Sequence, residues 1–98
     1  MVEINWTIRA LDDLEDIAQY ISKDSEKYAK ITIQKLFNSP DVLSQNPKLG
    51  RVVPEFKIET IREIIKGNYR IVYKIISAKS IDILAVHHSA RHLSADDL

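Results

Sequence analysis

Cysteine is absent from this chain of 98 residues, and glycine and proline are scarce, with two and three copies. Without cysteine the chain has no disulfide scaffold, no thiolate zinc site and no thiol chemistry, and it suits a reducing compartment. No apolar run approaches the length of a membrane span, and the N-terminus lacks the apolar segment of a signal peptide. We therefore expect a single domain, residues 1–98, in the cytoplasm, away from membranes.

The net charge is zero, but the charges are unevenly distributed. Residues 1–47 hold five Lys or Arg and eight Asp or Glu, a balance of −3, whereas residues 48–91 hold nine and four, a balance of +5. Asp96 and Asp97 bring the sum to zero. The basic second half can attract an anionic partner. The chain as a whole lacks the strong basicity typical of proteins that bind nucleic acid.

The first half of the chain predicts a strand followed by two helices. Residues 2–6 alternate apolar and polar side chains, and Thr7 is placed to cap a helix that ends near residues 22–24. Ser25 is placed to cap a second helix, which Pro40 interrupts with a short restart. The expected inner faces are Ile8, Leu11, Leu14, Ile17 and Ile21 on the first helix and Tyr28, Ala29, Ile33, Leu36 and Phe37 on the second. Helices joined by so short a link pack as an antiparallel hairpin.

From Arg51 onward the apolar period changes from 3.6 to 2. Residues 51–55 are extended but cannot form a central strand, because they contain Pro54. Strands are expected at 61–66, 69–76 and 81–87, with a two-residue hairpin turn at Gly67 and Asn68 and a second turn at 77–80. The predicted fold class is α+β: an N-terminal strand, an antiparallel helical hairpin and a three-stranded antiparallel meander.

The two-residue turn also predicts which side chains share a face of the sheet. It places Arg62 opposite Tyr73 and puts Arg70 on the other face. Arg70 has two interpretations. It can anchor a phosphate or carboxylate, which guanidinium groups bind with two hydrogen bonds. Alternatively, it forms a salt bridge on a solvent-exposed face, to Glu63 or Asp82.

Three histidines lie close together near the C-terminus, at 87, 88 and 92. Neighbouring strand residues point to opposite faces, so His87 and His88 are poorly placed to ligate one ion. With no cysteine nearby, we expect no metal site and no cofactor. A histidine acting as a general acid or base is an open alternative, since imidazole titrates near neutrality. No phosphate loop, dinucleotide fingerprint or nucleophile elbow is present.

Ordered motifs along nearly the whole chain resemble the RelE/ParE superfamily of toxins from type II toxin–antitoxin systems. The matching pieces are Trp6, Asp13-Leu14 with Ile17 and Tyr20-Ile21, Asn46-Pro47, Gly50-Arg51, Val53-Pro54-Glu55, Ile61-Arg62-Glu63, Tyr69-Arg70-Ile71-Val72-Tyr73, and Val86-His87-His88 through Arg91. The fold of that family agrees with the order of elements above. The resemblance implies a growth-inhibiting toxin that forms a hetero-oligomer with a cognate antitoxin, whose C-terminal segment wraps it.

Two activities occur in that superfamily. The chain looks closer to the ParE branch, whose members bind DNA gyrase and are not hydrolases, because its helical hairpin is long and residues 50–55 are typical of that branch. The alternative is a RelE-like ribosome-dependent mRNA endonuclease. The basic cluster of such enzymes is thin here, and no tyrosine follows Tyr73 to match their C-terminal catalytic tyrosine. A third reading is a degenerate toxin that only binds its antitoxin.

The resemblance also nominates site residues for each reading. If the chain is an endonuclease, the catalytic candidates are Arg70, His87, His88 and Arg91. The candidates for contact with the target or the antitoxin are Arg51, Arg62, Arg70, Tyr73 and Arg91.

Overall fold

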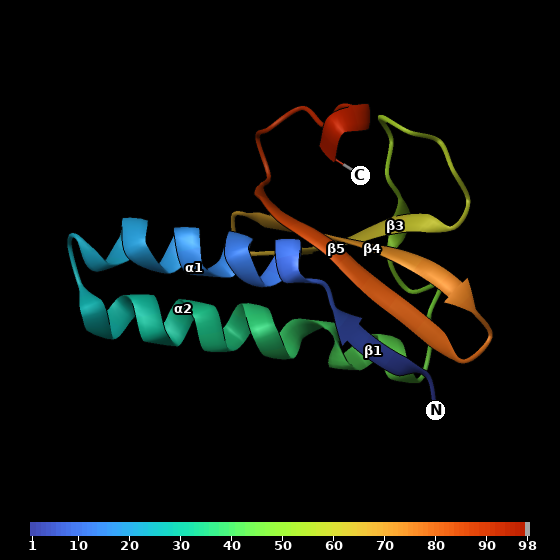
Figure 1. Ribbon diagram of the computed structural model, residues 1–98, viewed down its shortest axis with the longest axis horizontal. Coiled ribbons are helices and arrows are strands. Elements are labelled where there is room, and N and C mark those ends of the chain that lie inside the picture. Colours follow the sequence, from blue (N-terminus) through green and yellow to red (C-terminus); the bar gives the residue numbers. More distant parts are fainter. Residues whose placement is uncertain (98) are drawn as a thin grey trace.

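The computed structural model describes residues 1–97 as a helical hairpin packed on one face of a five-stranded sheet (Figure 1). The elements in order are β1 (Glu3–Trp6), α1 (Ile8–Ser22), α2 (Glu26–Asn38), the 3₁₀ turn η1 (Ser39–Ser44), β2 (Arg51–Val52), β3 (Ile61–Lys66), β4 (Tyr69–Ser77), β5 (Ser80–His88) and the 3₁₀ turn η2 (Ala95–Asp97). The predicted α+β class is confirmed. Within residues 1–97, no helix combines the length and the apolar character that crossing a membrane requires.

Both predicted helix caps form. The Thr7 hydroxyl accepts a hydrogen bond from the backbone N–H of Ala10 at 3.1 Å, and the Ser25 hydroxyl accepts one from Tyr28 at 3.0 Å. Such bonds satisfy N–H groups that the first turn of a helix leaves without partners. Beyond α2, Pro40 lies in the first turn of η1, so the restart predicted there is a 3₁₀ turn.

The sheet has the strand order β1-β5-β4-β3-β2. Strands β3, β4 and β5 form the predicted antiparallel meander, β1 adds in parallel to β5, and the two-residue β2 pairs with β3 at the opposite edge. The hairpin register is the predicted one, with Arg62 opposite Tyr73 and Ile65 opposite Arg70. The two arginines therefore lie on opposite faces of the sheet.

Each face of the sheet carries its own apolar cluster. The larger one, between sheet and helices, includes Leu14, Leu36 and Tyr73. The second, on the other face, consists of Val53, Ile61, Val72 and Leu93. Because Val53 and Leu93 come from segments outside the meander, this second face is covered by loops and the 3₁₀ turn η2, and not by an α-helix (Figure 1).

Part of the predicted helical inner face is exposed. Ile8, Tyr28 and Phe37 were expected to point inward, but they are 79%, 61% and 44% exposed. The buried residues of the two helices are Ala10, Leu14, Ala29 and Leu36. Phe37 stacks on Trp6 with ring centroids 5.1 Å apart, so the pair forms an apolar surface beside β1.

Candidate functional site

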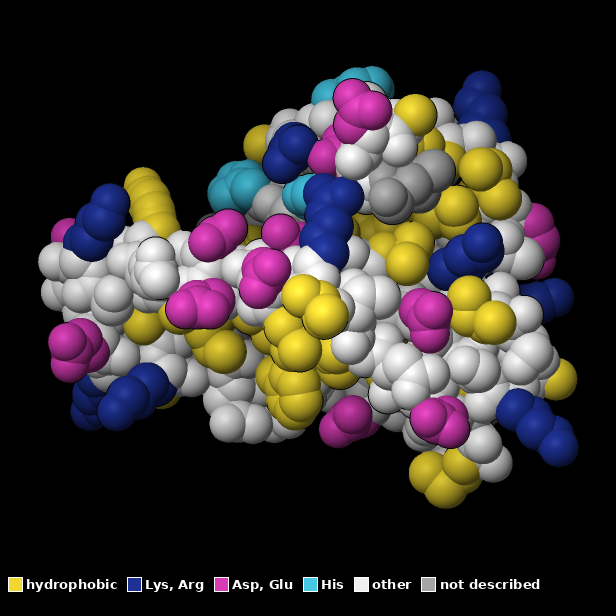
Figure 2. Space-filling view, in the orientation of Figure 1, with side chains coloured by type: hydrophobic (Ala, Val, Ile, Leu, Met, Phe, Trp, Pro, Cys, Tyr) yellow, Lys and Arg dark blue, Asp and Glu magenta, His cyan; other side chains and the backbone are white. Residues whose placement is uncertain are grey.

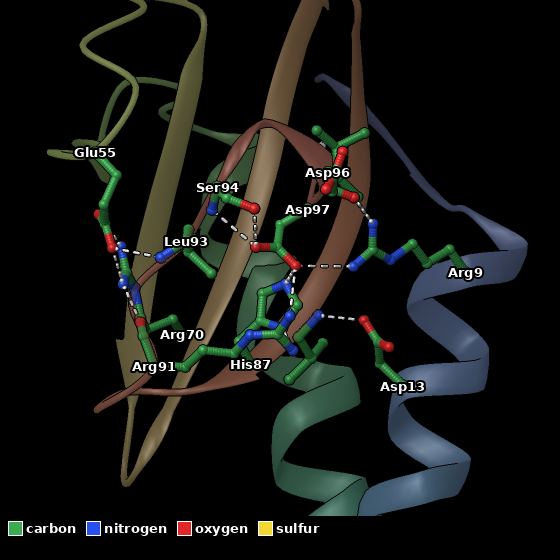
Figure 3. Close-up of polar contacts among 12 residues, drawn as sticks. Arg9, Asp13, Glu55, Arg70, His87, Arg91, Leu93, Ser94, Asp96 and Asp97 are labelled. Carbon is green, nitrogen blue, oxygen red and sulfur yellow. Dashed lines mark hydrogen bonds and ion pairs between the residues drawn. The ribbon is translucent and has the colours of Figure 1, made fainter.

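Arg70 lies buried on the sheet face that the helices leave free. Its side chain is 5% exposed, and Nε donates to Oε1 of Glu63 at 2.6 Å. Its two terminal nitrogens donate to the two carboxylate oxygens of Glu55, both at 2.7 Å. The predicted partner Glu63 is thus correct, but a solvent-exposed face is wrong. The loop that carries Glu55 covers the guanidinium (Figure 3).

The charges around Arg70 are balanced. Glu63 also accepts a hydrogen bond from Arg51 at 2.6 Å, so two arginines face two carboxylates. The bidentate bond from Arg70 holds the pKa of Glu55 far below its usual range, and the Glu55 carboxylate in turn raises the pKa of Arg70. Glu55 and Arg70 are therefore both charged at neutral pH and compensate each other.

A C-terminal strap (residues 89–97) closes over this network. The carbonyl of Arg91 accepts from Nη1 of Arg70 at 2.9 Å, and the backbone N–H of Leu93 donates to Glu55 at 3.0 Å. The Leu93 side chain is buried in the second apolar cluster. The strap is thus fixed at its middle by both polar and apolar contacts.

His87 lies directly opposite Arg70 in the ladder and is also covered by the strap. Its side chain is 4% exposed, and Nδ1 lies 3.4 Å from Nη1 of Arg91. Within residues 1–97, its Nε2 has no hydrogen-bond partner. Burial, reinforced by the charge of Arg91, lowers the pKa of His87 below its usual value. The imidazole is therefore neutral at pH 7.

Asp97 is a buried carboxylate at the end of the strap (Figure 3). Its Oδ1 accepts from Nη2 of Arg91 at 2.8 Å and lies 3.5 Å from Nη2 of Arg9. Its Oδ2 accepts from the backbone N–H of Ser94 at 2.8 Å. The Ser94 hydrogen bond, with help from the nearby positive charges, lowers the pKa of Asp97.

Two exposed candidates, His88 and Arg91, meet at a hollow of about 510 Å³ between α1 and the ends of β4 and β5. His88 is exposed there, with its ring edge against Tyr69 at a centroid distance of 5.9 Å, and Arg91 is 56% exposed. Acidic side chains line α1 beside the histidines (Figure 2). The hollow is lined by Asp13, Asp16, Ile17, Tyr20, Tyr69, Val86, His87, His88 and Arg91. It therefore presents both signs of charge and aromatic rings.

The remaining candidates do not join this hollow. Arg51 is 61% exposed at the β2 edge. Arg62, on the helix side of the sheet, donates to the carbonyls of Lys48 and Gly50 at 3.3 and 2.9 Å. Tyr73 is fully buried, and its hydroxyl accepts from Gly50 N–H at 3.0 Å and donates to the Pro47 carbonyl at 2.6 Å. We assign Arg62 and Tyr73 structural roles, because their polar groups are already used within the fold.

The sequence did not predict three charged residues that pair with the site candidates: the carboxylates Glu55 and Asp97 and the cation Arg9. Glu55 stood in a matching motif, but nothing in its spacing indicated a bond to Arg70. Asp97 and Arg9 meet across 88 residues of sequence. Arg9 is not one of the apolar positions that define the period of α1, and Asp97 follows the last predicted strand, so no local pattern predicted the contact. No group of three metal-ligating side chains lies close enough to hold an ion among residues 1–97.

Comparison with known proteins identifies the family. The model for the ParE toxin of the type II toxin–antitoxin system parDE matches residues 4–93. Protein Y4kP of Sinorhizobium fredii, which carries a toxin name, is 33% identical over 88% of this chain and 86% of its own length. Toxin RelE2 of Caulobacter vibrioides is 29% identical over 93% and 99%.

Solved structures share the fold. A chain of the chromosomal ParDE toxin–antitoxin system of P. aeruginosa matches with a TM-score of 0.72 at 21% identity, over 90% of this chain and 96% of that one. A chain of the toxin–antitoxin complex RelBE2 of Mycobacterium tuberculosis matches with a TM-score of 0.56 at 21% identity, over 89% and 96%. The chain therefore belongs to the ParE toxin family of type II toxin–antitoxin systems, within the RelE/ParE superfamily.

Proposed function

We propose that this toxin inhibits growth by binding DNA gyrase, without catalysing a reaction itself, and that a cognate antitoxin neutralises it. The observation that carries the proposal is the state of Arg70, whose guanidinium is buried and bonded to two carboxylates. An RNA phosphate would have to displace Glu55 and Glu63 to bind there, and the charge of Arg70 is already compensated.

One of the two candidate histidines for RNA cleavage, His87, is similarly unavailable. His87 is buried beneath the strap, and its lowered pKa disfavours the protonated form that would act as an acid near neutrality. The side chains that reach solvent, Arg51, His88 and Arg91, lie on different elements and are suited to contacts with a protein surface. The zero net charge likewise favours a protein target over ribosomal RNA.

An antitoxin partner is supported by apolar side chains that the fold leaves uncovered. Ile8, Leu11, Tyr20, Tyr28 and Phe37 on the two helices are all more than 40% exposed. Larger uncovered apolar patches are typical of interaction sites. The RelBE2 relative was solved as a toxin–antitoxin complex, and the ParDE relative belongs to such a system. We propose that an antitoxin segment covers these helical side chains.

The runner-up function is ribosome-dependent mRNA cleavage. It is favoured by the relative named toxin RelE2 and by the position of His88 and Arg91 together at the hollow. In this reading His88, the exposed histidine, would be the acid or base, and Arg91 would bind phosphate.

Pulse labelling distinguishes the two functions. Bacterial cells are given labelled thymidine and labelled methionine side by side, just after induction of this chain alone. If gyrase is the target, thymidine incorporation falls first; purified chain then also inhibits DNA supercoiling by gyrase. If methionine incorporation falls first, the gyrase proposal is wrong. If neither falls, the chain is an inactive relative that retains only antitoxin binding.

A matched pair of variants tests for catalysis directly. His88→Ala removes the exposed histidine of the hollow, whereas His92→Ala removes an exposed histidine outside it. Under the gyrase proposal both variants stay toxic, with His88→Ala at most weakened as a contact. Loss of toxicity in His88→Ala alone, with messenger RNA cleavage abolished at the ribosome, supports the endonuclease.

A further inference from the structure

Two adjacent hollows lie between α2 and the end of β3, and they share Lys35 and Lys66. The first, of about 540 Å³, extends toward Val42 in η1. The second, of about 240 Å³, extends toward Tyr28 and Tyr69. Neither hollow is lined by an acidic residue. Together they form one groove with two cations at its middle, which we call the lysine groove.

The fold leaves the charge of these two lysines uncompensated. Lys35 and Lys66 are both exposed, and within residues 1–97 neither forms an ion pair with Asp or Glu. Lys48, in contrast, lies 3.6 Å from Glu59. Two cations that face the same hollow create a positive potential there and attract an anionic group. The middle of the lysine groove is therefore suited to a carboxylate.

Exposed apolar side chains flank the two lysines on both sides. Tyr28 and Ile31 are 61% and 41% exposed in one hollow, and Val42 and Ile65 are 53% and 50% exposed in the other. Tyr28, Ile31 and Lys35 recur at spacings of three and four residues, so they lie along one face of α2. An occupant of the groove can therefore bury apolar groups on either side of its acidic group.

The backbone of β3 is free where it lines the groove. The N–H of Val53 donates to the carbonyl of Ile61 at 3.1 Å, and Arg51 lies opposite Glu63. The odd-numbered residues of β3 therefore direct their backbone groups toward β2. The next one, Ile65, lies beyond β2 and has no strand opposite it on that side within residues 1–97. Such an edge can bind an extended peptide through main-chain hydrogen bonds.

We propose that the lysine groove binds an extended, acidic segment of the cognate antitoxin. A carboxylate of the segment lies between Lys35 and Lys66, and an apolar side chain lies toward each end of the groove. Tyr28 and Val42 are each seven residues from Lys35, which corresponds to about 10 Å along a helix in either direction. An extended segment of about six residues spans that length.

This inference rests on the antitoxin partner of the proposed function and does not depend on gyrase being the target. It adds a second contact to the helical surface proposed above, and it states the chemistry of that contact. The unpaired lysines select an antitoxin with an acid at this position, because a neutral or basic residue there leaves both cations without a partner.

The test uses a synthetic peptide and the full chain. The probe is a blocked hexapeptide with the sequence leucine, threonine, glutamate, valine, threonine, leucine, and its matched control has glutamine in place of glutamate. Each peptide is titrated into the labelled chain, and the backbone amide resonances are followed by NMR. We expect the glutamate peptide to bind roughly three- to tenfold more tightly than the glutamine peptide, a preference that weakens at high salt. Binding should also slow hydrogen exchange at the amide of Ile65.

A matched pair of double variants locates the preference. Lys35→Gln with Lys66→Gln should abolish it. Lys30→Gln with Lys74→Gln should preserve it, because this pair also removes two exposed charges from α2 and the sheet, but neither residue lines the groove. Equal binding of the two peptides, a preference that survives in the first variant, or an unprotected Ile65 amide would each overturn the proposal.

Two further measurements separate this inference from the proposed function. Failure of the gyrase proposal appears in the supercoiling assay and leaves the peptide titrations unchanged. If the cognate antitoxin binds the chain equally well with and without Lys35→Gln and Lys66→Gln, the antitoxin partner stands and the lysine groove is not its site. If the chain alone forms dimers in sedimentation and the same double variant does not, the occupant is a second copy and the antitoxin assignment is wrong.

Discussion

Replacing Arg70 by alanine should destabilise the fold severely, because it removes a buried cation that is bonded to one fully buried and one largely buried carboxylate. Glu55 and Glu63 are 11% and 0% exposed at their side chains, and both are bonded to Arg70 at 2.6–2.7 Å. Removing one partner of a buried ion pair costs about 3–5 kcal/mol, since the remaining charge stays buried. A domain of this size has roughly 5–15 kcal/mol of total stability.

Urea unfolding at pH 7 measures this change. With a denaturant slope of about 1–2 kcal/mol per molar urea, the urea midpoint of Arg70→Ala should fall by roughly 1.5–5 M. Arg51→Ala is the matched control, because Arg51 bonds the same Glu63 at 2.6 Å but is 61% exposed. An exposed pair contributes about 1 kcal/mol or less. Both variants lose a 2.6 Å bond to Glu63, but Arg70 is buried and also loses its bonds to Glu55 and to the carbonyl of Arg91.

The difference between the unmodified chain and Arg70→Ala should also depend on pH. Arg70 depresses the pKa of Glu55 below its ordinary value of 4.5, so the pair contributes stability above pH 4.5 that is lost as the pH falls. The gap in unfolding free energy should therefore be largest near neutrality and narrow below about pH 4.5. If Arg70→Ala costs no more than Arg51→Ala, and the gap is independent of pH, then Arg70 is not buried and paired. The burial of Arg70 would then no longer disfavour an endonuclease.

Three other changes test separate parts of the fold. Tyr73→Phe should lower the free energy of unfolding, measured in urea, by about 1–3 kcal/mol, because it leaves the Gly50 N–H and the Pro47 carbonyl unpaired. Tyr69→Phe should lower it less, because the hydroxyl of Tyr69 has no partner within residues 1–97. Gly50→Ala should cost about 1–3 kcal/mol or more, because its Cβ would lie 2.5 Å from the Glu63 carbonyl oxygen; a stable variant would show that this loop has shifted. Folding lowers the pKa of His87 below its ordinary value of 6.5. The contribution of the neutral imidazole to the free energy of unfolding is therefore present above pH 6.5 and is lost as the pH falls. His87→Gln should flatten the stability curve just below pH 6.5, and an unchanged curve would mean that His87 is solvated.

Local chemistry made the meander predictable. Gly67, with φ at +59°, and Asn68 form a two-residue turn, which fixes the parity of both flanking strands. That parity correctly separated Arg62 from Arg70. The helix caps at Thr7 and Ser25 were also predictable from local sequence, because each cap depends only on residues within one helical turn.

Burial of the sheet's second face could not be predicted in the same way. The segments that cover Arg70 and His87 are the loop with Glu55 and the C-terminal strap, and neither has an apolar period. Their positions depend on contacts between residues far apart in sequence, such as Leu93 with Glu55. On the helices, in contrast, the sequence predicted burial for side chains that are exposed. An apolar period shows that a face can be buried, but Ile8 and Phe37 remain 79% and 44% exposed.

The chemistry open to Arg70 is therefore decided by two acidic residues and not by the arginine itself. A guanidinium on a sheet face can bind phosphate when water or an exposed side chain is its alternative partner. Glu55 and Glu63 replace that alternative with bonds of 2.6–2.7 Å to Arg70 in a buried setting, bidentate from Glu55 and single from Glu63. A phosphate can take their place only by removing Arg70 from both carboxylates, which leaves Glu55 without a cationic partner at that distance and Glu63 with Arg51 alone. A chain with neutral residues at both positions would present the same arginine as a free cation. The presence of Glu55 and Glu63 is thus the sequence feature that most strongly favours a binding toxin here over a nuclease.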